Sequence, residues 1–261
     1  MRPVRLNMNA QRLLVWLPPA LLIAALVGLW ELLSHTLDVE PWLLPAPSLI
    51  GNEIGDSFSL LMRHTRITVQ EILVGFSIAA GLGALLAAAI AWSRIVERSL
   101  YPIVIASQTI PVITLAPLLL VWVGPQMTSK VIVVVLISFF PVVVNLVDGL
   151  RSADKEMSDM LRTLGARPVQ LLLKLKLPAA LPYLFSGLKV AAVTSVIGAV
   201  VGEWVGGQGG LGWLMKVSGP QFRTDRVFAA IFILSLVAVA LFLAVVAAER
   251  WFLRRHGPRG A

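Results

Sequence analysis

The sequence contains no cysteine, and its three histidines, His35, His64 and His256, lie far apart along the 261 residues. The lack of cysteine excludes disulfide bonds, thiolate metal ligands, iron–sulfur clusters and a cysteine nucleophile. The separated histidines show no spacing typical of a metal site, and no serine, histidine and acidic residue are placed as a catalytic triad. We therefore predict no catalytic residue, no metal ligand and no enzymatic activity.

Charged residues are scarce as well: they make up 14% of the chain, whereas hydrophobic residues make up 57% even without glycine. Soluble domains contain about 25% charged residues and about 45–50% apolar residues with glycine counted. A water-soluble fold of this size would not hide so much apolar surface, which indicates a membrane protein. The net charge of +8 resides mainly in short segments between apolar blocks, where it is typical of a topology signal and not of a nucleic-acid partner.

No phosphate-binding loop of the form G-x-x-x-x-G-K-S/T occurs, which excludes the usual nucleotide cradle. Residues 207–212 do match the dinucleotide motif G-x-G-x-x-G. That motif belongs between a strand and a helix of a βαβ unit, and here it follows a long apolar block. We interpret it as a flexible loop outside the membrane.

Six apolar blocks are long enough, or nearly so, to cross a bilayer, which takes about 20 residues at about 1.5 Å per residue. They run over residues 13–33, 72–92, 100–123, 131–147, 179–201 and 227–248. We therefore predict an all-α integral membrane protein with a single transmembrane domain over residues 1–261. The first block is too long for a secretory signal peptide, so we expect it to remain as a span. The third contains Pro102, Pro111 and Pro117, which favour bends.

The basic residues separate into two groups when the segments between blocks are taken alternately. Of the 22 Lys and Arg residues, 15 lie in one group with both termini and residues 151–178, six lie in the other, and Lys189 lies inside a block. Cytoplasmic loops of membrane proteins are enriched in Lys and Arg. We therefore predict a multi-pass protein with both termini and residues 151–178 in the cytoplasm. Residues 38–63 are expected outside, as a loop with a surface helix.

Residues 151–178, the longest of the cytoplasmic loops, carry a pattern of their own. Asp154 is placed to cap a helix. Apolar residues then recur at helical spacing and form one stripe: Met157, Met160, Leu161 and Leu164. Gly165 and Pro168 are typical of the end of such a helix. The pattern predicts a short amphipathic helix, whose apolar side could lie on lipid headgroups or dock on a partner protein.

The spacing of residues in this loop resembles the EAA signature, EAA-x3-G-x9-I-x-LP, of permease subunits in binding-protein-dependent ABC importers. The matching positions are Asp159-Met160-Leu161, Gly165, Leu175 and Leu177-Pro178. All gaps agree with the signature, whereas Asp replaces Glu and larger apolar residues replace both alanines. The resemblance favours docking on a partner over lying on the lipid.

Further stretches extend the resemblance over about residues 43–250. The nitrate, sulfonate and taurine permease group is similar to this chain at residues 43–48, 108–111, 116–117, 202–205 and 210–212. Residues 139–142 and 195–199 most resemble the branch that imports pyrimidine precursors of thiamine, or riboflavin. The implied substrate is therefore a thiamine pyrimidine precursor or riboflavin, with a sulfonate, taurine or nitrate as the alternative.

The family resemblance implies a type I ABC importer permease in a bacterial inner membrane. Such a permease works with a second copy of itself and with two cytoplasmic ATPase subunits, which bind the ATP and Mg. A periplasmic or lipid-anchored binding protein delivers the substrate. The chain itself would contact membrane lipid and bind no cofactor and no nucleic acid.

The resemblance also assigns roles within residues 151–178. The apolar members of the stripe would form a knob buried in the ATPase, inside a rim of charged side chains. The glycine would permit the turn, and the Leu-Pro pair would redirect the chain into the fifth block. The residues expected to couple the ATPase are Glu156, Asp159, Met160, Leu161, Arg162, Leu164, Gly165, Leu177 and Pro178.

Polar residues inside the blocks are candidates for the translocation pathway: Gln108, Thr109, Asn145, Lys189, Thr194, Ser195 and Glu203. Lys189 lies about ten residues into its block, a costly place for a charge unless it faces a pathway or pairs with a side chain such as Asp148. Glu203 lies at the outer mouth, where it could act in a gate or contact the binding protein. Most of the other polar residues are expected to bond neighbouring helices.

Two other classes of membrane protein fit the sequence less well. An ion-driven secondary transporter would need acidic residues at mid-membrane and usually a repeated half. A membrane-embedded enzyme would need acidic residues or histidines clustered at one depth. The blocks contain no mid-membrane acid and no visible repeat, which favours the ABC permease.

Overall fold

The computed structural model describes residues 8–37 and 39–256, with side chains from Leu17 to Arg254, and every regular element among these residues is a helix. The first half contains α1 (Met8–Thr36), α2 (Pro47–Asp56), α3 (Phe58–Trp92), α4 (Arg94–Ser107), α5 (Val112–Val123) and α6 (Met127–Arg151). The second half contains α7 (Lys155–Thr163), α8 (Pro168–Leu171), α9 (Leu177–Gly206), α10 (Leu211–Ser218) and α11 (Thr224–His256). A π-helical turn (Leu172–Lys176) joins α8 to α9, and a 3-10 turn (Gly219–Gln221) follows α10. The expected all-α fold is confirmed.

The chain folds as two compact units. The smaller takes in the described part of Met1–Ser59 together with Val217–Ala229, and the larger takes in Leu60–Lys216 with the described residues from Ala230 onward. The long helices α3 and α11 each contribute residues to both units.

Polar side chains fasten the smaller unit. The carboxylate of Glu31 on α1 accepts hydrogen bonds from the backbone N and the hydroxyl of Ser48, at 3.0 and 2.7 Å, at the start of α2. Glu53 is buried and accepts from the guanidinium groups of Arg223 and Arg226, at 2.6 and 2.7 Å. Hydrogen bonds that Arg223 donates to Asp225 raise the pKa of its guanidinium group.

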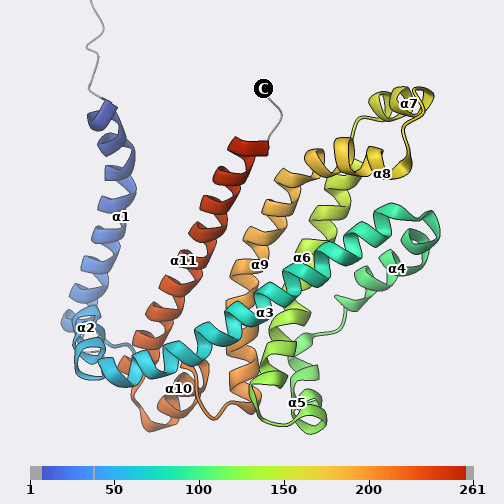
Figure 1. Ribbon diagram of the computed structural model, residues 1–261. Helices are drawn as coiled ribbons and strands as arrows, with labels where there is room; N and C mark the ends of the chain where they lie inside the picture. The colour runs from blue at the N-terminus through green and yellow to red at the C-terminus, as the bar shows by residue number, and fades with distance from the viewer. Residues whose placement is uncertain (1–7, 38, 257–261) are drawn as a thin grey trace, which may run out of the picture. The chain divides into compact units, whose positions relative to one another are not determined.

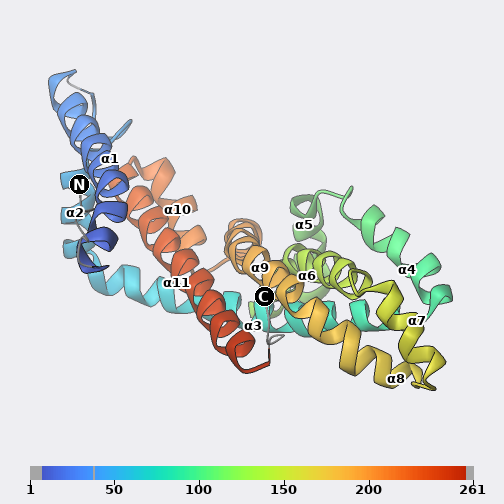
Figure 2. The ribbon, with the colours of Figure 1, turned by 90° about the horizontal axis from the view of Figure 1, so that it is seen from above.

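The larger unit is built around α6 and α9, which lie side by side in both ribbon views (Figures 1 and 2). Glycine makes this close packing possible. A Cβ atom added at Gly198 would lie 2.8 Å from the Cα atom of Val134 on α6. Helix α3 crosses α6 in the same manner, because a Cβ atom at Gly83 would lie 2.9 Å from Val142. Small residues of this kind allow helix backbones to approach closely within a membrane.

Five helical segments are long and apolar enough to cross a membrane: Leu17–Thr36, Phe58–Trp92, Met127–Arg151, Pro168–Gly206 and Thr224–Arg254. A sixth span would consist of α4 and α5 together, which meet at an angle of 95°. The third apolar block, expected as one bent span over residues 100–123, is therefore two helices. The break precedes Pro111, which has no N–H to continue the helix, whereas Pro102 and Pro117 lie inside α4 and α5.

The fifth apolar block also differs from expectation. The Leu177-Pro178 pair does not end the helix, because residues Pro168–Gly206 form one continuous helical segment of 39 residues. Pro178 offers no N–H to the carbonyl of Lys174, and the π-helical turn just before it changes the hydrogen-bond register, with Leu177 N bonding Leu172 O. The helix thus absorbs the proline without ending.

Within the larger unit, α7 and the C-terminal end of α11 lie toward the same end, and α10 lies toward the opposite end (Figure 1). The basic segments of this unit that we assign to the cytoplasm therefore share one end of the helix bundle.

Candidate functional site

Helix α7 is defined by capping interactions at both ends. The Asp154 carboxylate accepts from the backbone N of Glu156 at 2.8 Å and of Met157 at 3.4 Å, which confirms the expected N-cap. At the other end Gly165 has a φ of +83°, and Ala166 N bonds Leu161 O at 3.0 Å. This Schellman arrangement requires a residue that tolerates a left-handed backbone, so Gly165 ends the helix as expected.

The two sides of α7 have opposite character. Met157, Met160 and Leu164 are exposed by 42%, 50% and 74%, whereas Ser158 on the other side is buried. Leu161 is half-buried, so it belongs partly to the interior of the loop. The apolar stripe therefore forms an exposed surface that the described residues leave uncovered. Glu156 and Arg162 are exposed beside it, and Arg162 pairs with Asp159 at 3.5 Å.

A second group of polar side chains is buried at the opposite end of the larger unit. Glu203, near the end of α9, is fully buried and accepts from Thr68 Oγ1 at 2.6 Å and from Gly212 N at 2.5 Å. Lys130 at the start of α6 pairs with Glu71 on α3 at 3.1 Å, and both are buried. We call the set His64, Thr68, Glu71, Lys130 and Glu203 the outer polar cluster.

The glycine-rich loop closes over this cluster. Three successive backbone N–H groups donate into it: Gly210 to His64 Nδ1 at 3.1 Å, Leu211 to Thr68 Oγ1 at 2.8 Å, and Gly212 to Glu203. Gly210 has a φ of +100°, and a Cβ atom there would lie 2.1 Å from the Glu203 carboxyl. The loop expected to be flexible is therefore anchored, and its glycines allow close approach to a buried carboxylate.

The buried position of Glu203 bears on one of its two expected roles, contact with a binding protein. A side chain with no exposed surface is not available to contact a binding protein in this structure. Its hydrogen bonds with Thr68 and Gly212 instead hold α9 to α3 and to the start of α10.

Four members of the outer polar cluster were missed by the sequence analysis. His64, Thr68 and Glu71 stand at positions i, i+4 and i+7 of α3, which places them on one helix face. That spacing was visible, but an apolar block was expected to begin only at residue 72. Lys130 gave no comparable signal, because it was counted among the loop residues.

The other pathway candidates do not gather at one place. Lys189 pairs with Glu249 on α11 at 3.0 Å and not with Asp148, which lies 4.0 Å from Arg151. Asn145 donates to Pro141 O at 2.8 Å. Hydroxyl groups bond within the helix packing as well: Ser195 donates to Ala192 O at 2.7 Å, and Thr194 lies 3.5 Å from Ser138.

Gln108 and Thr109 occupy a different environment. They lie at the break between α4 and α5, where residues 108–111 are all exposed. Their backbone N–H groups bond Ile105 O and Ala106 O at 3.2 and 3.0 Å and so close the last turn of α4, and Thr109 Oγ1 also donates to Ala106 O at 2.7 Å. Over residues 8–37 and 39–256, no three His, Asp or Glu side chains are grouped to hold a metal ion.

Comparison with known proteins identifies relatives along most of the chain. The family described as "Binding-protein-dependent transport system inner membrane component" matches residues 79–255. A formylaminopyrimidine transport permease protein of Halalkalibacterium halodurans is 40% identical over 238 residues, which cover 91% of this chain and 95% of that protein. A riboflavin transport system permease protein of Chloroflexus aurantiacus is 36% identical over 215 residues, which cover 82% and 80%.

A solved structure of the inward-facing MetNI methionine ABC transporter has a similar fold. The TM-score is 0.66 at 20% sequence identity, and the alignment covers 75% of this chain and 97% of the other. The arrangement of the helices is therefore similar to that of a solved ABC transporter chain.

Proposed function

The chain belongs to the family of binding-protein-dependent transport system inner membrane components, the permeases of ABC importers, and on this premise we propose that α7 docks a separate ATPase and couples it to solute import. ATP and Mg would be bound by that partner, since this sequence has no phosphate-binding loop. The protein would work in a bacterial inner membrane, with α7 on the cytoplasmic side.

The exposed apolar stripe of α7 carries this proposal. Three large apolar side chains on a capped, rigid helix stand outside the fold, although full burial would stabilise each by about 1.5–3 kcal/mol. An amphipathic helix that enters a hydrophobic groove of a partner recovers this energy. The exposed Glu156 and Arg162 beside the stripe would orient the contact.

A test replaces Leu164, the most exposed member of the stripe, by glutamate. Burying an unpaired charge in a docking contact costs about 2–5 kcal/mol, so binding of the ATPase should weaken by about 30-fold or more. Thr163→Glu is the matched control, because Thr163 is exposed on the same helix outside the stripe and bonds only Met160 O. Co-purification of the ATPase and transport should be lost in the first variant and retained in the second.

The rival interpretation of α7 gives a different result. A helix that lies on lipid headgroups would be loosened from the membrane by Leu164→Glu, but the ATPase would still co-purify at the wild-type yield. That outcome, with transport intact, would remove the docking assignment.

The break between α4 and α5 supports assembly with a second copy. Non-helical backbone at membrane depth is tolerated where it is buried in protein or lines a water-filled cavity, and not where it faces lipid. Residues 108–111 are exposed in the single chain, so a second copy or a shared pathway would cover them. Gln108 and Thr109 are therefore the pathway candidates that the geometry favours.

The proposed substrate is a thiamine pyrimidine precursor or riboflavin, delivered by an external binding protein. Two relatives above 35% identity are named for formylaminopyrimidine and riboflavin transport. A sulfonate, taurine or nitrate is the alternative. Binding of each compound to the partner binding protein, measured by calorimetry, would decide among them: tight binding of a sulfonate alone would reject the first assignment.

A further inference from the structure

A pocket of about 330 Å³ opens between α7 and the ends of α3, α4 and α6. Five basic side chains line it: Arg94, Arg151, Lys155, Arg162 and Lys176. Two acidic side chains, Glu97 and Asp159, lie among them. The pocket therefore carries a net positive charge, and of its basic residues the proposed docking of α7 uses only Arg162.

The acidic side chains neutralise only part of this charge. Arg151 pairs with Glu97 and lies 4.8 Å over the ring of Tyr101, and Arg162 pairs with Asp159 at 3.5 Å. Arg94, Lys155 and Lys176 form no ion pair with any side chain that the structure describes.

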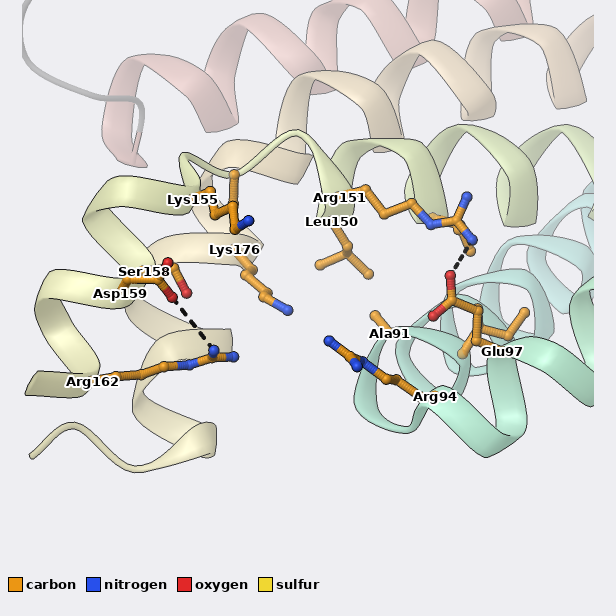
Figure 3. A pocket seen from close by; sticks show the side chains of 13 residues that line it. Ala91, Arg94, Glu97, Leu150, Arg151, Lys155, Ser158, Asp159, Arg162 and Lys176 are labelled. Carbon is orange, nitrogen blue, oxygen red and sulfur yellow. Dashed lines mark hydrogen bonds and ion pairs between the residues drawn. The ribbon is translucent and has the colours of Figure 1, made fainter.

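The unpaired cations converge. Figure 3 shows Arg94 and Lys176 extending toward one another from opposite walls of the pocket. Like charges held close together repel, so an anion placed between them would be stabilised by both. Guanidinium and ammonium groups are the usual protein ligands of phosphate.

Apolar side chains line the pocket as well. Ile90, Val147 and Leu150 line it and are buried. All three lie at helix ends on the side of the bundle that carries the basic segments, at the boundary between apolar spans and charged loops. A pocket lined by both cationic and apolar side chains fits an anion that carries an apolar portion better than it fits a fully hydrated ion.

Helix α7 presents its charged face to this pocket and its apolar stripe away from it. Lys155, Ser158, Asp159 and Arg162 line the pocket, and these positions repeat at three and four residues. The stripe of Met157, Met160 and Leu164 lies on the opposite side of the helix. A partner docked on the stripe would therefore leave Arg94 and Lys176, which lie on other elements, free for a second ligand.

We propose that this pocket binds the phosphate group of an anionic membrane lipid at the cytoplasmic surface. Basic pockets between transmembrane helices on the cytoplasmic side are typical sites for such headgroups. The bound phosphate would join α4, α7 and the turn before α9, and so fix α7 relative to the membrane. The proposal requires the predicted orientation of the chain but not the docking of an ATPase.

The test measures lipid binding to the purified full-length permease by native mass spectrometry. The probes are dioctanoyl phosphatidylglycerol, dioctanoyl phosphatidylcholine and inorganic phosphate. Arg94→Gln/Lys176→Gln should weaken phosphatidylglycerol binding by about 10- to 30-fold, since each basic residue near such a headgroup contributes about 1 kcal/mol. Phosphatidylcholine should bind weakly to every form of the protein.

The matched control is Arg98→Gln/Lys174→Gln. These residues lie on the same two elements and are exposed, and they do not line the pocket. Retained binding in the control supports the site, and equal losses in both double variants would overturn it as general surface charge. Arg94→Lys/Lys176→Arg, which keeps both charges, should bind the lipid and excludes misfolding as the cause of a loss.

Two further outcomes would overturn the lipid assignment. Inorganic phosphate that binds as tightly as phosphatidylglycerol, with the same dependence on Arg94 and Lys176, would assign the pocket to free phosphate. Unchanged lipid binding with loss of ATPase co-purification would make the pocket a contact for acidic residues of the ATPase. Because lipid binding is measured without the ATPase, failure of this proposal leaves the docking test of Leu164→Glu unaffected.

Discussion

Replacing Lys130 by methionine tests the outer polar cluster most directly. The ammonium group lies 3.1 Å from Glu71 Oε1, and both side chains are almost fully buried. Removing one partner of such a pair leaves an uncompensated buried charge, which costs about 3–5 kcal/mol. For a chain of this size the apparent melting temperature should fall by about 6–20 °C. Lys174→Met, at an exposed lysine, is the control and should change it little.

The double variant Lys130→Met/Glu71→Gln tests whether an unpaired charge, and not the changed shape of the side chain, lowers the stability. Glutamine is neutral, so the double variant contains no unpaired buried charge. Most of the lost stability should therefore return if the ion pair is the cause. The assay is thermal unfolding of the purified permease in detergent, followed by intrinsic fluorescence. An unchanged melting temperature in Lys130→Met, or a double variant as unstable as the sum of its parts, would refute the assignment of these residues to a buried charge pair.

Three other perturbations follow from the geometry. Gly210→Ala forces a side chain into a left-handed backbone and against Glu203, and should cost about 1–3 kcal/mol, measured as a lower melting temperature; wild-type stability would contradict the anchored loop. Lys189→Leu should destabilise the protein and Lys189→Leu/Glu249→Leu should restore it if the 3.0 Å pair is structural, whereas transport lost in a stable double variant would indicate a pathway role. Because the chain has no cysteine, Gln108→Cys should form a disulfide-linked dimer in membranes on oxidation, while Leu85→Cys, at an exposed position of α3, should not; the reverse pattern on gels would reject the proposed second copy at the break.

Local features of the fold could be predicted from the sequence because their causes are local. The ends of α7 follow from Asp154 and Gly165, which act on backbone groups two or three residues away. The apolar blocks likewise identify the long helices, since length and hydropathy decide whether a segment can span a membrane.

Features that depend on distant partners could not be predicted. Lys189 pairs with Glu249, which is 60 residues away on another helix, and nothing in the spacing favours it over Asp148. Glu203 was placed at the outer mouth, but its burial depends on Thr68 and the loop before α10. Three prolines were expected to bend the third block, but only Pro111 coincides with a break, whereas Pro102 and Pro117 lie inside helices. The sequence alone does not distinguish them.

The continuous helical segment Pro168–Gly206 connects the two sites. Its 39 residues, at about 1.5 Å each, span about 58 Å, and it begins just beyond α7 and ends three residues past Glu203. A tilt of about 5° about the inner end would displace the outer end by about 5 Å, which exceeds the reach of a hydrogen bond. A movement of α7 at the ATPase that tilts this segment would therefore open the contacts of the outer polar cluster.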